Sequence, residues 1–282
     1  MLIRQIGLID RTGTIDPTIM ASVAAAISIQ VTRDLSQFWP VSATVQALPA
    51  NGGVPPGCIP AYIVSNLPAG ESGVHQSNNN QPYIQVEAGP GWMLAASHEI
   101  CEMLVDPSMN HLQAATAISV DADGNVSNTD GQFEYLVEVC DPSADPSHAY
   151  FINGYPMADF YTPHYFDPVA AGSSVRYSFN GGITAPRQVL KGGYLSWHDP
   201  VKLVWQMLDY VNNDPPLIIG LPDMTTAGAL REKVDRYHRT TRRLSATPPS
   251  HDLLKRALRR QDELKMAAES NARMYQELSE RR

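Results

Sequence analysis

The alternation of apolar and polar residues over the first hundred positions predicts short strands around a helix. Residues 2–9 and 41–48 are apolar runs with the composition of strands, and residues 59–67 form a third such run. Between the first two runs, apolar residues recur every four positions, which predicts a helix that begins after Asp16-Pro17 and ends near Pro40. The apolar positions of this helix are Ile19, Val23, Ile27, Val31 and Leu35.

The pattern from residue 70 onward predicts a loop, a strand and a second helix. Residues 70–81 are polar and favour a loop, and residues 82–88 form a short apolar strand. A helix follows from Trp92 to about Val105, and it ends at Asp106-Pro107 because a residue before proline disfavours the helical conformation. The resulting order, β-α-β-β-β-α, predicts a small mixed sheet with helices packed on it.

The remainder of the chain is less regular. Residues 108–230 are rich in Pro, Gly and Asn, with hairpins expected in 120–139 and a helix in 200–211. Two further helices are expected at about 226–244 and 250–281. We therefore expect an α+β protein with three parts: a small mixed sheet with a motif-bearing helix at 1–107, an irregular, hairpin-rich subdomain at 108–225 that completes a cleft, and a helical tail at 226–282.

Charge divides the chain into an acidic body and a basic tail. The net charge of −8 is the sum of −14 over residues 1–230 (7 Lys and Arg, 21 Asp and Glu) and +6 over residues 231–282 (14 and 8). A body poor in cations argues against a nucleic-acid surface there, while the tail stays open to nucleic acid. No apolar run is long enough to span a membrane, and the N-terminus lacks the features of a signal peptide. Three cysteines favour a reducing compartment.

The segment with the clearest chemistry is Ser97-His98-Glu99-Ile100-Cys101-Glu102. On a helix, His98 and Glu102 project from one face about one turn apart, so that an imidazole nitrogen and a carboxylate oxygen can bind the same ion. Glu99 would point toward the open coordination position, where it can accept a proton from water. The motif is His-Glu-x-x-His with Glu in place of the second His.

With this motif on its second helix, the predicted order of residues 2–106 resembles the N-terminal half of the zincin metallopeptidases. The resemblance implies that His98 and Glu102 bind Zn²⁺ and that Glu99 is the general base. It also implies that the strand before the helix, through Tyr83, Ile84, Gln85 and Val86, forms the edge of the substrate cleft. Glu102 departs from the family, and a carboxylate at this position leaves another divalent metal open.

A third ligand must come from another element. The metzincin branch places a His six residues after the second ligand, where this chain has Ser108, whereas the gluzincin branch uses a Glu from a later element. Glu138 is the best candidate, with Glu134 and Asp141 as alternatives. Asp106 continues the face of His98 and Glu102 but lies about 12 Å along the helix, so it is read as a helix-end or outer-sphere group.

The segments SHEICEMLVDP and EVCDP, followed by residues 158–163, are also similar to an uncharacterised family of bacterial and phage proteins that are metallopeptidase-like. The first hypothesis is accordingly a zinc-dependent peptidase acting on a peptide or protein substrate. The alternative is a non-catalytic structural or binding component of a larger assembly, such as a phage particle, that docks through residues 226–282. The expected location is cytoplasmic or virion-associated.

Overall fold

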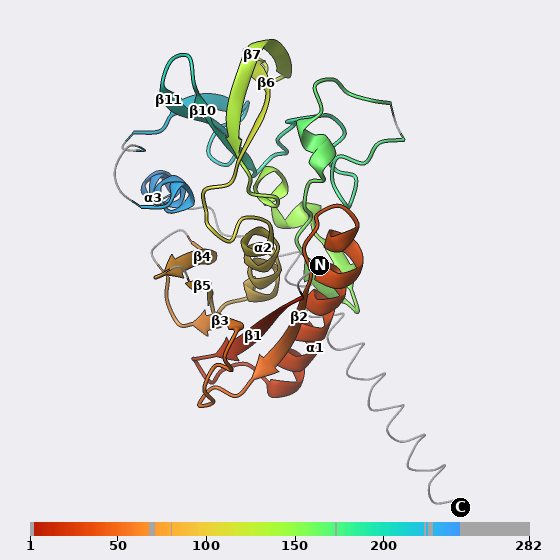
Figure 1. Ribbon diagram of the computed structural model, residues 1–282, viewed down its shortest axis with the longest axis vertical. Helices are drawn as coiled ribbons and strands as arrows, with labels where there is room; N and C mark the ends of the chain where they lie inside the picture. Colours follow the sequence, from red (N-terminus) through yellow and green to blue (C-terminus); the bar gives the residue numbers. More distant parts are fainter. Residues whose placement is uncertain are drawn as a thin grey trace, which may run out of the picture.

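The computed structural model describes residues 3–67, 71–79, 81–172, 174–222, 224 and 228–242. Within these residues the fold is α+β, with two five-stranded sheets, a small hairpin and three α-helices. Figure 1 shows the helix α2 (Trp92–Val105) between the first sheet and the second. The expected helix at 250–281 lies outside the described residues.

The first sheet is formed by the N-terminal part of the chain. Its strand order is β2-β1-β3-β5-β4, in which β4 alone runs antiparallel to its neighbour. The strands are β1 (Arg4–Asp10), β2 (Ala43–Leu48), β3 (Cys58–Val64), β4 (Gly73–Asn78) and β5 (Gln81–Glu87).

The helix α1 (Pro17–Ile29) follows β1, as the sequence predicted. The Asp16 carboxylate accepts hydrogen bonds from the backbone of Thr18 and Ile19, which satisfies the first free N–H groups of the helix. Helical backbone continues as a π turn (Gln30–Asp34) and a 3-10 turn (Leu35–Gln37). The apolar stripe predicted for this helix is buried from Val23 to Leu35.

α1 packs on β2, and α2 packs on β4 and β5. A hydrogen bond of 2.8 Å from Ser97 Oγ to Gln30 Oε1 joins the two helical segments. Both helices therefore cover the same side of the first sheet, and the motif-bearing helix lies beside the edge strand β4.

Two expectations for this half of the chain were wrong. Residues 70–81 contain the strand β4 and not a loop, because an edge strand needs few apolar residues and this one pairs with β5 through a tight hairpin in which Asn79 has a φ of 50°. The strand at 82–88 is not at the edge of the sheet: β5 pairs with β3 on one side and with β4 on the other.

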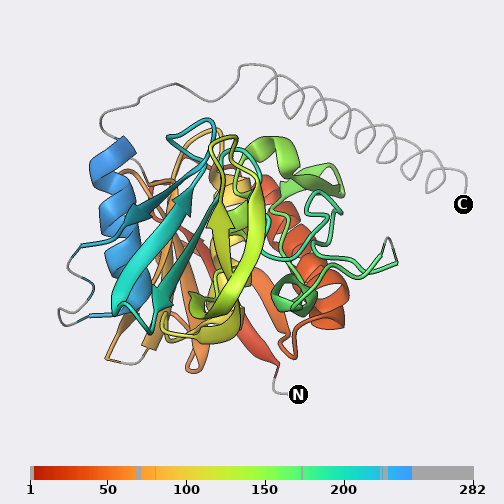
Figure 2. The same ribbon diagram turned by 90° about the horizontal axis from the view of Figure 1, so that it is seen from above.

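The second sheet is antiparallel, with the order β12-β11-β10-β7-β6, and Figure 2 looks onto it with α3 (Leu230–Arg242) along one side. The expected hairpin within 120–139 is present in β6 and β7. The prediction of a helix at 200–211 was wrong, because this segment is a turn followed by the strand β11 (Val204–Asp209). The bounds are β6 (Leu112–Val120), β7 (Val126–Leu136), β10 (Tyr194–Asp199), β11 (Val204–Asp209), β12 (Leu217–Gly220) and the hairpin β8 (Tyr150–Ile152) and β9 (Tyr155–Met157).

One hydrophobic core joins the two sheets, and it contains Ile6 and Ile63 from the first and Tyr135 and Trp197 from the second. A smaller cluster lies under α3, where Val234 packs with residues of the second sheet, including Leu136 and Met207. The described part of the basic tail is thus packed on the body. No helix among the described residues has the length and apolar character needed to cross a membrane.

Candidate metal centre

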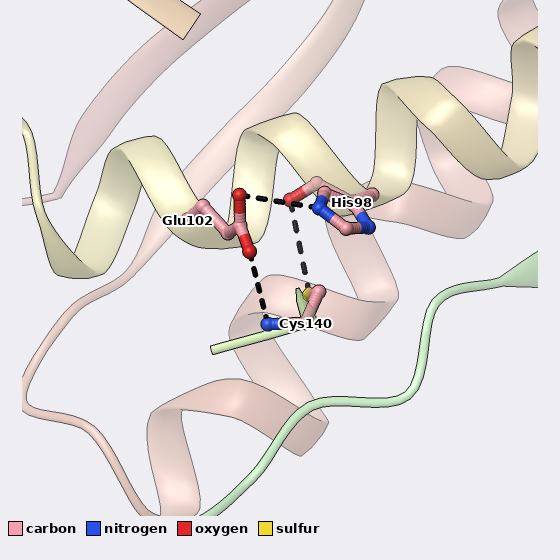
Figure 3. Close-up of side chains that lie close together, drawn as sticks. All are labelled: His98, Glu102 and Cys140. Atoms are coloured by element: carbon pink, nitrogen blue, oxygen red, sulfur yellow. Dashed lines mark hydrogen bonds and ion pairs between the residues drawn. The ribbon is translucent and has the colours of Figure 1, made fainter. Parts of the chain in front are cut away.

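The helix α2 brings His98 and Glu102 together on one face. Their side chains lie one turn apart, and His98 Nε2 is 3.2 Å from Glu102 Oε2, as Figure 3 shows. Glu102 is fully buried, whereas the His98 side chain keeps 15% of its surface exposed. The spacing predicted from the sequence therefore produces a close imidazole–carboxylate pair.

The carboxylate of Glu102 is held in this orientation by the segment that follows β7. The backbone N–H of Cys140 donates a hydrogen bond of 3.1 Å to Glu102 Oε1, which leaves Oε2 facing His98. The Cys140 thiol points to the backbone carbonyl of His98, with Sγ 3.8 Å from the oxygen. Burial, with added contributions from Cys101 and the neighbouring carboxylates, raises the pKa of the Cys140 thiol well above its usual value. In the metal-free protein the Cys140 thiol is therefore protonated, and its Sγ is also one of the atoms that could bind an ion together with His98 and Glu102.

The same segment supplies two of the predicted ligand candidates. Asp141 Oδ1 lies 3.3 Å from His98 Nε2, whereas Glu138 Oε2 lies 3.7 Å from Nε2 of a different histidine, His75. The backbone on either side of Glu138 is fixed, because Val137 N–H donates to His111 O and Tyr161 N–H donates to Val139 O. Asp141, an alternative in the sequence interpretation, is therefore the carboxylate that meets His98.

Sequence reasoning missed His75, which lies on β4 and is 1% exposed. Its Nδ1 is 3.1 Å from Glu99 Oε2 and 3.9 Å from Glu102 Oε2. The only feature of the sequence that could have indicated His75 is its position shortly before the motif. Because residues 70–81 were predicted to form a loop, His75 was not placed on a strand beside the motif-bearing helix. Glu99 is thereby placed between α2 and the edge strand.

Gly73 on β4 allows this close approach. A Cβ atom at position 73 would lie 2.7 Å from Glu99 Cγ and 3.0 Å from Glu99 Oε1. Such distances are too short for non-bonded atoms, so any larger residue would displace the Glu99 side chain. The absence of a side chain at Gly73 therefore helps to set where Glu99 lies.

Arg231 is the second residue that sequence reasoning missed. It lies at the start of α3, is 4% exposed, and places its guanidinium among three carboxylates. It forms ion pairs with Asp141, with Glu102 (Nη2 to Oε2, 3.4 Å) and with Asp235 (Nε to Oδ1, 3.0 Å). The guanidinium carbon also lies 5.7 Å from the centroid of the Tyr194 ring. Nothing in the local sequence distinguishes this arginine from the others of the basic tail.

The surrounding charges favour opposite protonation states at different positions of the cluster. Burial lowers the pKa of His98, but the Glu102 charge and the close carboxylates of Asp141 and Glu102 outweigh it and raise this pKa well above its usual value. Burial raises the pKa of Glu102, and the charges of His98 and Arg231 reverse that shift and lower it far below the usual range. Burial raises the pKa of Glu138 well above its usual value, which Arg231 only partly opposes. Such divergent shifts are common at functional sites.

Several buried atoms of the cluster lack hydrogen bonds. Glu102 Oε2, Asp141 Oδ1, both carboxylate oxygens of Glu138 and His75 Nε2 accept none from the described residues. His98 Nε2 lies 3.2 Å from Glu102 Oε2 and 3.3 Å from Asp141 Oδ1, and two ligands of one ion have such separations when the metal–ligand bonds are about 2.0–2.1 Å. The candidate ligand atoms of His98, Glu102 and Cys140 lie within 4.8 Å of one another, and so do those of His75, Glu99 and Glu102. The described residues therefore include groups that could hold a divalent ion, with Asp141 beside His98 as a further carboxylate.

The structure places the other predicted residues away from this ion position. Asp106 accepts hydrogen bonds from Ser108 Oγ and His111 N–H at the end of α2. Glu134 lies on the face of β7 opposite the buried Tyr135, and its carboxylate contacts His198 Nδ1 at 2.8 Å.

The proposed substrate strand, 82–88, is β5 in the interior of the first sheet. Ile84 and Val86 are completely buried in the core, and Tyr83 donates a hydrogen bond to Gln76 on β4. Because both edges of β5 are paired along most of the strand, Tyr83, Ile84, Gln85 and Val86 cannot add a substrate strand to the sheet. The edge strand is β4 instead.

Comparisons with protein-family models, with curated proteins and with solved structures gave no match.

Asp235 gives the metal-free protein a distinct pH dependence. Burial raises its pKa to about 7, against an ordinary value of 3.8, although Arg231 opposes the shift. Between these values the folded state holds more protons than the unfolded state, so the free energy of unfolding falls as pH rises, by at most about 1.4 kcal/mol per pH unit. Urea unfolding from pH 4 to 8 should show a shallower decline for Asp235→Asn, whereas the exposed control Asp123→Asn should match the parent. Equal slopes in parent and Asp235→Asn would contradict this assignment.

Arg231 should oppose metal binding, because its charge lies beside the same carboxylates. We expect Arg231→Met to bind Zn²⁺ at least about tenfold more tightly, corresponding to about 1.4 kcal/mol of relieved repulsion. Arg231→Lys keeps the charge and should stay close to the parent. Competition against a zinc chelator measures the affinities, with thermal unfolding as a check on folding. Weaker binding by Arg231→Met would mean that the guanidinium mainly holds the ligands in position.

Proposed function

We propose that the protein is a metal-dependent hydrolase of the zincin type that cleaves peptide bonds. The observation that carries the proposal is that His98 Nε2 meets one oxygen of Glu102 and one of Asp141, while Glu99 of the same helix contacts His75 instead. The antiparallel edge strand β4 beside α2 supports it, because the zincin resemblance requires an edge strand along a substrate cleft. The proposal uses Asp141 as third ligand in place of Glu138.

In this proposal each residue has a defined task. His98, Glu102 and Asp141 would hold a zinc ion, and Cys140 N–H keeps Glu102 oriented toward it. When bound, such an ion polarises the scissile carbonyl and lowers the pKa of water. Glu99 accepts the proton from the attacking water and passes it to the leaving amine. His75 Nδ1 fixes Glu99 Oε2, so that Oε1 is the oxygen available for the proton.

The edge strand β4 would align the substrate. An extended peptide can add to an unpaired strand edge through main-chain hydrogen bonds, which gives affinity without a particular sequence. Because β4 carries both Gly73 and His75, a peptide along this edge would pass close to Glu99.

The test uses the full chain, stripped of metal and reloaded with Zn²⁺. We expect cleavage of a diverse peptide library that is lost on chelation and restored by Zn²⁺. A protein that retains stoichiometric zinc and cleaves no peptide would defeat the proposal and favour the non-catalytic alternative.

A further inference from the structure

His75 Nε2 and the carboxylate of Glu138 face each other in the interior, and no described residue places a hydrogen-bond donor between them. The two residues are 1% and 4% exposed. Nε2 and Oε2 are 3.7 Å apart, which is too long for a hydrogen bond. Nε2 and both oxygens of Glu138 have no hydrogen-bond partner among the described residues. Buried polar atoms normally have partners, so this arrangement requires an explanation.

The contact of His75 Nδ1 with Glu99, on the other side of the ring from Glu138, determines which ring nitrogen carries the proton. Nδ1 lies 3.1 Å from Glu99 Oε2, and a carboxylate acceptor at that distance favours the proton on Nδ1. Nε2 then presents a lone pair toward a carboxylate oxygen. Two electron-rich groups that face each other in the protein interior are costly, and a cation between them removes the cost. A carboxylate–histidine pair of this kind is also the usual outer support of a metal-binding imidazole.

The spacing of the pair suits a common metal ion. Two donors bound at about 2.0–2.2 Å to one Zn²⁺ lie roughly 3.3–3.8 Å apart when the angle between them is tetrahedral or somewhat wider. Both oxygens of Glu138 are free, so this residue can supply one donor atom or two. The Tyr161 hydroxyl is buried and likewise lacks a hydrogen-bond partner among the described residues, and the Tyr161 backbone N–H donates to the carbonyl of Val139, next to Glu138.

The cluster holds more acidic groups than basic ones. Five carboxyl groups and one guanidinium lie in it, and Glu138 is the carboxyl group that faces His75 Nε2. A buried excess of like charge is strongly unfavourable, since it is poorly screened by solvent, and a divalent ion at this position would reduce it. The members are Glu99, Glu102, Glu138, Asp141, Asp235 and Arg231.

We propose that His75 Nε2 and Glu138 form a second site for a divalent cation of the Zn²⁺ class, beside the ion at His98, Glu102 and Asp141. The two sites use opposite sides of the cluster, because Asp141 contacts His98 whereas Glu138 contacts His75. The second ion would join β4 of the first sheet to the segment that follows β7 of the second. This inference does not depend on hydrolysis, because a second ion that only stabilises the fold would also be bound at His75 and Glu138.

The test is the zinc stoichiometry of the full chain. After dialysis against Zn²⁺ at a fixed free concentration, elemental mass spectrometry should give two equivalents per chain for the parent. His75→Gln and Glu138→Gln should each give one, and His98→Ala should also give one because it removes only the other site. The control His164→Gln alters an exposed histidine that pairs with Asp167 at 2.9 Å, and it should retain two equivalents.

The outcomes separate this inference from the proposed function. One equivalent in the parent that persists in His75→Gln and Glu138→Gln and disappears in His98→Ala would overturn the second site and leave the first intact. Two equivalents with the expected losses, but without peptide cleavage, would support the second site and count against hydrolysis. If His75→Gln fails to fold, Glu138→Gln decides the question: loss of one equivalent would support the second site, and two equivalents retained in this variant would overturn it.

Discussion

Glu99→Gln should lower kcat/KM for peptide cleavage by about 10²–10⁴-fold while leaving the zinc content unchanged. The amide keeps the size of the side chain and can still accept a hydrogen bond from His75 Nδ1, but it cannot take a proton from water. Because Glu99 makes no contact with His98 Nε2, its replacement should leave the ligands of the first ion in place. The loss should therefore appear in catalysis and not in metal affinity.

The measurement is steady-state kinetics on one cleaved peptide, with metal content determined on the same samples. Glu134→Gln is the matched control, because Glu134 also contacts a histidine, His198, on the second sheet. We expect this control to retain full activity. Cleavage by Glu99→Gln at the parent rate would remove Glu99 from the mechanism, and loss of zinc in this variant would make it a ligand.

His98→Ala and Glu102→Gln should each remove one equivalent of zinc and abolish hydrolysis. Each change deletes a donor at a point where two carboxylate oxygens meet one imidazole nitrogen. Zinc bound only by the folded state stabilises it by about 2.7 kcal/mol when the free concentration is one hundred times Kd. The part of this zinc-dependent stabilisation that comes from the first site should therefore disappear in both variants.

Thermal unfolding with and without Zn²⁺ measures this effect, and His198→Ala controls for the loss of a histidine that contacts a carboxylate elsewhere. A parent protein whose unfolding temperature does not respond to Zn²⁺ would contradict the metal centre. If Zn²⁺ raises the unfolding temperature of the variants as much as that of the parent, the ion must be bound by other ligands.

The parts of the fold predicted from the sequence are those set by local patterns. The stripe from Val23 to Leu35 predicted a helix because an apolar residue recurs at every fourth position, and the structure buries those positions. The same periodicity placed His98 and Glu102 on one face of α2, where their side chains meet. In these segments the interactions between near neighbours in the chain determine the result.

The parts that the sequence did not reveal depend on contacts between distant segments. β4 is polar because only one of its edges is paired, so its composition is that of a loop. His75 and Arg231 reach the cluster from positions far apart in the chain, and no local spacing marks either of them. The choice between Glu138 and Asp141 likewise follows from how the segment after β7 crosses α2, which the hydrogen bond from Cys140 N–H to Glu102 fixes.

The position of Arg231 in the last described helix also bears on how the chain is made. The acidic residues from Glu99 to Asp141 precede Arg231 by 132 to 90 positions, so they are synthesised and leave the ribosome first. Among the described residues, Arg231 is the one lysine or arginine that forms an ion pair with Glu102 or Asp141. Until it arrives, a nascent body would have to leave these groups open to solvent, protons or metal ions. The order of translation thus gives an ion from solution its first access to the carboxylates before the arginine of the chain can compete.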